Sequence, residues 1–60
     1  MPSDETRRLL KLFGVAVTNL EDALDKKAPA SEIMKHDMEL ADRMRDVTAH
    51  LDRLRSRRFS

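Results

Sequence analysis

Residues 9–17 form an almost uninterrupted apolar run, Leu-Leu-Lys-Leu-Phe-Gly-Val-Ala-Val, in a chain of only 60 residues. Coiled into a helix, this run presents apolar side chains around most of its circumference, and so short a chain has too few other residues to cover them. Small domains usually compensate with disulfides, a metal or oligomerisation. The chain has no cysteine, so we expect another chain to cover the apolar surplus.

The first half of the sequence has the period of an amphipathic helix. Ser3 is a favourable N-cap, and Asp4 and Glu5 place negative charge in the first turn, where the helix dipole favours it. Apolar positions then recur at spacings of three and four residues. We predict a helix over about residues 4–27, with its main stripe at Leu10, Phe13, Val17, Leu20 and Leu24, widened on one flank by Leu9, Ala16 and Ala23.

The segment Ala28-Pro29-Ala30-Ser31 interrupts this pattern. Proline cannot continue a helix, because it lacks an N–H and its ring clashes with the preceding turn, although it is tolerated in the first turn of a new helix. We predict a break at 28–31, a second helix over about 32–57 and a frayed basic tail at 58–60. The stripe of the second helix consists of Ile33, Leu40, Met44, Val47, Leu51 and Leu54.

So short a break makes the two helices antiparallel neighbours. The predicted fold is therefore all-α: one antiparallel helical hairpin spanning 1–60, which dimerises into a four-helix bundle or a larger helical oligomer. Matching the two stripes places Leu20 opposite Leu40 and Phe13 opposite Val47. Asp37 interrupts the second stripe; it is either solvated at the edge of the stripe or a polar contact that fixes the register of an oligomer.

Several residues lie off the two stripes. Leu12 and Val15 form a narrower second stripe, which is either a second interface or ordinary surface. Gly14, between them, either allows a close helix approach or is a tolerated surface position. Met34 and Met38 also lie off the centre of their stripe, and we assign them to a subunit interface rather than to a cofactor.

The sequence has no pattern that indicates catalysis. It has one glycine, no cysteine nucleophile and no serine–histidine–acid arrangement, so we expect neither an enzyme nor a cofactor. Two acid–histidine pairs at spacing four, Glu32 with His36 and Asp46 with His50, are expected to lie on a solvated face. Because the two histidines are about 21 Å apart along a helix, they cannot share one metal, and only a site assembled between subunits stays open.

The C-terminal end is locally basic. Arg53, Arg55, Arg57 and Arg58 are candidates for contacts with nucleic-acid phosphates, although cations near the end of a helix are also favoured by its dipole. The net charge of the whole chain is only +1, which gives no general attraction to nucleic acid or membrane.

These observations favour one functional class and leave two alternatives. We expect a cytoplasmic protein-interaction module: a small adaptor, regulatory or accessory subunit that forms a homodimer or higher oligomer and holds itself or a larger protein. The first alternative is a regulator that binds nucleic acid through its arginines. The second is a helical bundle that binds a metal or cofactor. We predict no membrane contact, because the apolar run is far below the ~20 residues of a spanning helix and the acidic N-terminus does not resemble a signal peptide.

Overall fold

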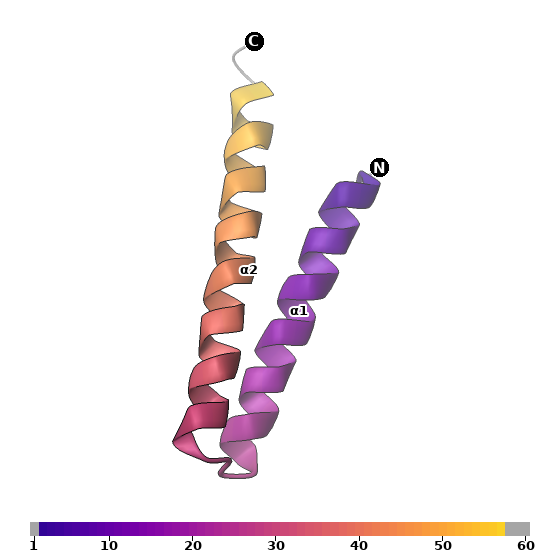
Figure 1. Cartoon of the computed structure of the whole chain (residues 1–60). Coiled ribbons are helices and arrows are strands. Elements are labelled where there is room, and N and C mark those ends of the chain that lie inside the picture. The colour runs from indigo at the N-terminus through magenta and orange to yellow at the C-terminus, as the bar shows by residue number, and fades with distance from the viewer. Residues whose placement is uncertain (1, 58–60) are drawn as a thin grey trace.

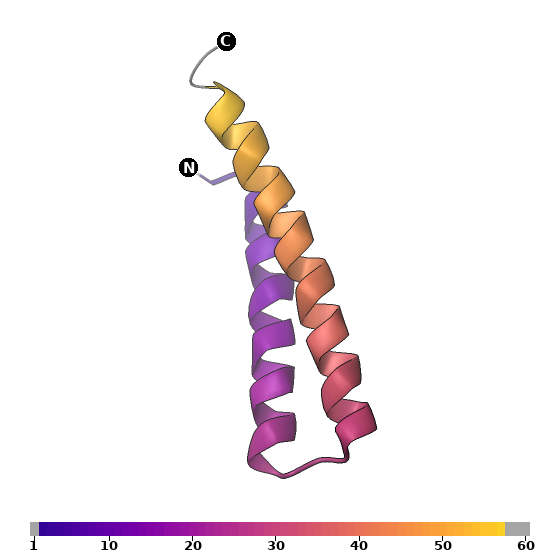
Figure 2. The same cartoon turned by 90° about the vertical axis from the view of Figure 1, so that its left-hand side faces the viewer.

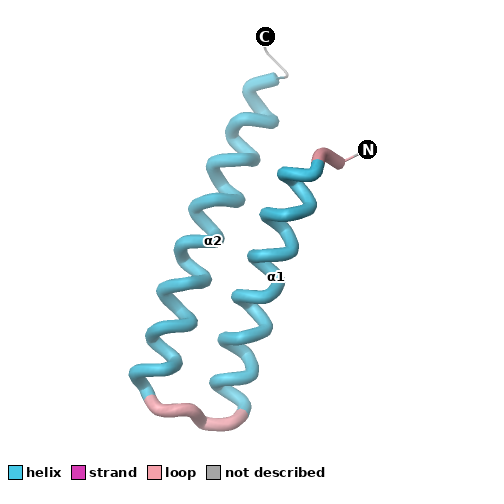
Figure 3. Tube along the Cα trace, turned by 45° about the vertical axis from the view of Figure 1, so that its right-hand side comes forward, coloured by secondary structure: helices cyan, strands magenta, loops and turns pink. Residues whose placement is uncertain are grey.

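The computed structural model describes residues 2–57 as two α-helices joined by a short loop (Figure 1). Helix α1 spans Asp4–Asp25 and helix α2 spans Ala30–Ser56. They pack against each other as an antiparallel hairpin with extents of 47 × 18 × 12 Å, which confirms the predicted all-α hairpin (Figure 3). The predicted association of hairpins into a bundle stays a prediction. The predicted tail at 58–60 lies outside the described residues.

The start of α1 is capped as the sequence predicts. The Ser3 hydroxyl accepts a hydrogen bond from the Thr6 amide at 3.1 Å, and the Ser3 carbonyl accepts one from the Arg7 amide at 3.1 Å. The first of these bonds satisfies an amide that a helix leaves without a partner in its first turn, and the second is the first regular bond of the helix. Asp4 and Glu5 add the negative charge that this end of the helix dipole favours.

The end of α1 closes in a Schellman motif, slightly before the predicted boundary. The Lys27 amide donates to the Leu24 carbonyl at 3.2 Å, and the Ala28 amide donates to the Ala23 carbonyl at 2.9 Å. Closing these bonds puts Lys27 in the left-handed region, with φ of 55°. This conformation costs energy for any residue with a Cβ, and glycine is the usual choice at this position.

Pro29 gives α2 its start. Its φ of −58° and ψ of 153° are those of an N-cap residue, and its carbonyl accepts hydrogen bonds from the amides of Glu32 at 3.0 Å and Ile33 at 3.1 Å. The helix therefore begins at Ala30, two residues before the predicted position. Ser31, the last residue of the predicted break, lies inside the first turn of α2.

The contact between the helices is built around small side chains. The buried apolar residues among those described are Leu9, Ala16 and Ala23, which are spaced by seven residues along α1. The period of the apolar residues predicted this row only as a flank of the main stripe. Half-buried side chains surround it, namely Leu12, Phe13 and Leu20 from α1 and Ile33, Leu40, Val47 and Leu54 from α2.

One contact between the helices defines their register. The Thr6 hydroxyl oxygen lies 2.7 Å from His50 Nε2, so Thr6 and His50 are opposite each other. In an antiparallel pair this places Leu9 level with Val47 and Ala16 level with Leu40. The register differs by about one helical turn, roughly 6 Å, from the predicted pairing of Phe13 with Val47. The reason is that α1 ends and α2 begins earlier than predicted, which moves the loop toward the N-terminus.

The helices are close near the loop and diverge toward the termini in the view of Figure 1. Figure 2 shows that they also cross at an angle rather than running strictly side by side. The shape follows from the buried row, because Ala16 and Ala23 allow a close approach in the loop half, whereas the larger Leu9 lies in the other half.

The left-handed residue at the end of α1 provides a stability test. We expect Lys27→Gly to raise the free energy of unfolding by about 1 kcal/mol, because glycine removes the steric cost of a positive φ. Urea unfolding at matched protein concentration measures this. The control is Lys26→Gly, where φ is −90° and no gain is expected. Equal stability of the two variants would contradict the assignment.

Candidate interaction surface

Each helix carries a row of exposed apolar side chains. On α1 the row consists of Leu10, Val17 and Leu24, which are 57%, 40% and 54% exposed. On α2 it consists of Met44 and Leu51, which are 51% and 43% exposed. All five were predicted to lie in a core or an oligomer interface, and the packing between the two helices leaves them uncovered.

The two rows lie on the same side of the hairpin. Each of these rows is shifted by one residue from a row that faces the other helix. Leu10 comes directly after the buried Leu9, and Leu51 comes directly after the buried His50. One residue is a rotation of about 100° around a helix. Because the two helices are antiparallel, a step of one residue toward the C-terminus turns from the facing row toward the same side of the pair in both helices. We call this side the apolar face; it comprises Leu10, Phe13, Val17, Leu20, Leu24, Ile33, Leu40, Met44 and Leu51.

The side of α2 that faces α1 is partly polar. His36 and Arg43 are half-buried there, and His50 is only 8% exposed. This corrects the expected pair of Asp46 and His50 on a solvated face: Asp46 forms an ion pair with Arg43 at 3.4 Å, and His50 points toward α1. His36 Nδ1 is buried and has no hydrogen-bond partner among the described residues. The predicted stripe residues Val47 and Leu54 are half-buried between these polar groups.

His50 is the centre of a hydrogen-bonded network at the open end of the hairpin. Its Nε2 lies 2.7 Å from the Thr6 hydroxyl oxygen, which is itself 3.0 Å from the Ser3 hydroxyl oxygen. On its other side, the guanidinium of Arg53 lies 3.3 Å from His50 Nδ1 and 3.2 Å from a Glu5 carboxylate oxygen. The network therefore joins the N-cap of α1 to the last turns of α2.

The network requires one tautomer of His50. A guanidinium can only donate hydrogen bonds, so its contact with Nδ1 makes this nitrogen the acceptor. The proton of the neutral imidazole is then on Nε2 and is donated to the Thr6 hydroxyl, which leaves that hydroxyl able to donate to Ser3. Both ring nitrogens are satisfied, which is the condition for burying a histidine at low cost.

Two of the arginines near the C-terminal end of α2 form ion pairs within the chain. Arg53 pairs with Glu5, and Arg55 pairs with Asp52 at 3.8 Å. Exposed pairs of this kind contribute little to stability. Arg57 is exposed at the end of α2, and Arg58 lies outside the described residues. Contact of these arginines with nucleic acid stays a prediction from the sequence.

No metal centre is formed within residues 2–57, where no three His, Cys, Asp or Glu side chains are grouped to hold a metal ion. The sequence alternative placed such a site around Glu32, His36, Asp46 and His50. Both nitrogens of His50 are already occupied by hydrogen bonds, so this residue has no free lone pair to offer to a metal.

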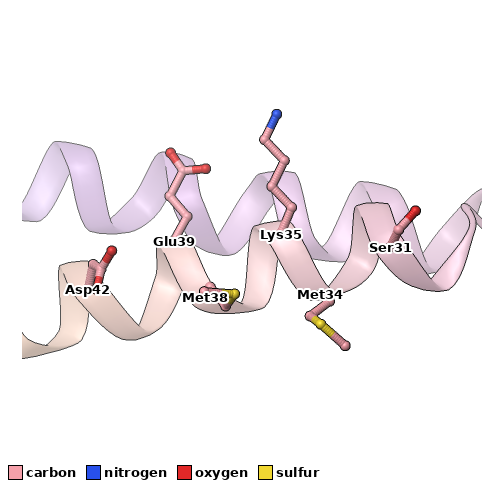
Figure 4. A pocket seen from close by; sticks show the side chains of 6 residues that line it. All are labelled: Ser31, Met34, Lys35, Met38, Glu39 and Asp42. Carbon is pink, nitrogen blue, oxygen red and sulfur yellow. The ribbon is translucent and has the colours of Figure 1, made fainter.

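The two methionines of the first half of α2 lie on a separate surface. Met34 and Met38 are exposed and line a shallow groove with Lys35 and Glu39 (Figure 4). Ser31 and Asp42 lie at its two ends. The groove lies along a single helix, so it offers only a small apolar area.

The predicted second stripe is divided by the structure. Leu12 is half-buried between the helices, whereas Val15 is 49% exposed. Val15 and Val17 are two residues apart, which is about 200° around a helix, so Val15 lies on the side of α1 away from the apolar face. Gly14 lies in open space, because a Cβ added there would meet no atom within 4 Å. Asp37, which interrupts the predicted stripe of the second helix, is exposed.

The comparisons with known proteins do not place the chain in a family. No protein-family model matches it, and no match was found among curated proteins or solved structures. Within residues 2–57, neither helix is long and apolar enough to cross a membrane.

The network around His50 provides a second stability test. We expect Thr6→Val to lower the free energy of unfolding by about 1–3 kcal/mol, because it leaves the buried Nε2–H of His50 without an acceptor. Urea unfolding measures the loss. The matched control is Thr18→Val, whose exposed hydroxyl only bonds the Gly14 carbonyl of its own helix, so the change stays within about 0.5 kcal/mol. Equal losses in the two variants would show that the network is not a structural contact.

Proposed function

We propose that the chain is a non-enzymatic protein-interaction module, a small oligomeric adaptor, regulatory or accessory subunit, which associates through its apolar face into a four-helix bundle. The observation that carries the proposal is the contrast between the contact that joins α1 to α2 and the exposed apolar face beside it. The contact between α1 and α2 buries only one large apolar residue, Leu9, whereas five large apolar residues are 40% or more exposed on the apolar face.

Energy favours covering this face. Full burial of a leucine, valine or methionine side chain is worth about 1.5–3 kcal/mol. The five side chains of the two exposed rows are about half exposed, so covering them is worth roughly 4–7 kcal/mol for each chain. Contiguous exposed apolar surface of this kind is typical of interaction sites.

The size of the face suits a protein partner. The broad side of the hairpin extends over 47 Å by 18 Å, so a second hairpin of the same dimensions can cover it along its whole length. The side of α2 away from the apolar face is polar, with Lys35, Glu39 and Asp46 exposed. Among the described residues the apolar face therefore gathers more exposed large apolar side chains than any other side, and a hairpin covered on this face by another hairpin is a four-helix bundle.

Two valines of α1 provide a matched test of the face. We expect Val17→Lys to abolish association, because a lysine at the centre of the apolar row would lose its hydration in the interface. We expect Val15→Lys to leave association unchanged, because Val15 is similarly exposed on the other side of the helix. Sedimentation equilibrium at micromolar concentration should give a multiple of 7.0 kDa for the parent and Val15→Lys, and 7.0 kDa for Val17→Lys.

Two results would contradict the proposal. One is a parent protein that sediments as a folded monomer of 7.0 kDa, as judged by circular dichroism of the same sample. The other is dissociation by Val15→Lys but not by Val17→Lys, which would transfer the interface to the second stripe predicted from the sequence.

A further inference from the structure

The charges of the chain are segregated along the hairpin. The half that contains the loop, residues 16–40, has six acidic residues and three lysines, a charge of −3. The remaining residues have five acidic residues and nine arginines or lysines, a charge of +4, and all of these charged residues except Arg58 belong to the described part of the hairpin. The two halves account for the net charge of +1 of the chain, which hides the difference between them.

Charged residues beside the apolar face are distributed in the same way, with an acid toward the loop and a base toward the termini. Asp37 and Arg55 are 18 residues apart, which is five complete helical turns, so they lie in one line along α2 about 27 Å apart. Met44 and Leu51 lie between them beside this line. The row thus begins with an exposed acid in the loop half and ends with an exposed base in the half that contains the termini.

We propose that the partner of the apolar face is a second copy of this chain, docked by a two-fold axis with the two loops at opposite ends of the bundle. The inference rests on the proposed self-association and adds the direction in which the second copy docks. In this arrangement each negative half lies against a positive half. The row from Asp37 to Arg55 then runs antiparallel to its own copy, with acid toward base at both ends.

The opposite arrangement, with both loops at one end, is disfavoured by the same charges. Packed helices are 8–10 Å apart, which is close to the Debye length of ~8 Å at physiological ionic strength, so charges across the interface still interact. With both loops at one end, the two negative halves would face each other, as would the two positive halves. Charge patterns of this kind determine orientation more than affinity.

Distances between spin labels distinguish the two arrangements. The chain has no cysteine, so Ser31→Cys and Ser56→Cys each introduce a unique labelling site, one exposed near the loop and one exposed near the C-terminal end of α2. With the loops at opposite ends, two labels at position 31 should be about 35–45 Å apart. With the loops at one end, they should be within the width of a bundle, roughly 20–25 Å.

A mixed sample and a salt series complete the test. Chains labelled at 31 and mixed with chains labelled at 56 should give a short distance, within about 25 Å, only when the loops are at opposite ends. Raising the salt from about 0.01 M to about 1 M shortens the Debye length from ~30 to ~3 Å and should weaken the dimer several-fold. If like halves faced each other, the same salt would strengthen it.

Failure of this inference is distinct from failure of the proposed function. A stable dimer with labels at position 31 within about 25 Å of each other would overturn the orientation and leave self-association intact. A protein that stays at 7.0 kDa at every concentration would overturn both. Labelled chains must first give the same mass as the parent, so that the labels themselves are excluded as a cause of dissociation.

Discussion

The structure depends on how little apolar surface the two helices bury against each other. Within residues 2–57, two of the three buried apolar residues, Ala16 and Ala23, are alanines, which bring the helices close together but remove few carbon atoms from water. The larger apolar side chains therefore lie beside this contact rather than in it. They form a continuous face that the described residues of the hairpin leave exposed, and that constraint leads to the proposed oligomer.

Polar groups contribute to the contact between the helices at the open end of the hairpin. At the open end, the contact between the helices includes Thr6, His50 and Arg53, with the last two on successive turns of α2. Such contacts are directional, because each donor must meet an acceptor, so they define register in a way that alanines alone cannot. The capping of α1 by Ser3 belongs to the same network, which couples formation of this helix end to its docking on α2.

The proposed function follows from these two features together. A hairpin whose inner contact defines register, but contributes little burial, is a suitable half of a bundle. The segregated charges would then determine how two such halves recognise each other, since apolar contact alone is not directional. Nothing in this proposal requires catalysis or a bound cofactor, and its testable quantities are mass, orientation and salt dependence.

Much of the fold could be predicted from local sequence alone. Ser3 as N-cap, Pro29 at the break and the period of the apolar residues are short-range signals, and they were sufficient for two helices and an antiparallel hairpin. The helix ends were shifted by one or two residues, because the Schellman motif places Lys27 in a conformation that its sequence does not indicate. That small shift was enough to change the register by one turn.

Only the tertiary structure decided which side of each helix faces the other. The apolar residues of α1 cover a wide arc, and periodicity gives the centre of that arc but not the direction of the neighbouring helix. Packing selects Leu9, Ala16 and Ala23, because small side chains permit close approach, and leaves Leu10, Val17 and Leu24 exposed. It also turns His50 inward to Thr6, 44 positions away in the chain, a distance over which sequence periodicity carries no information.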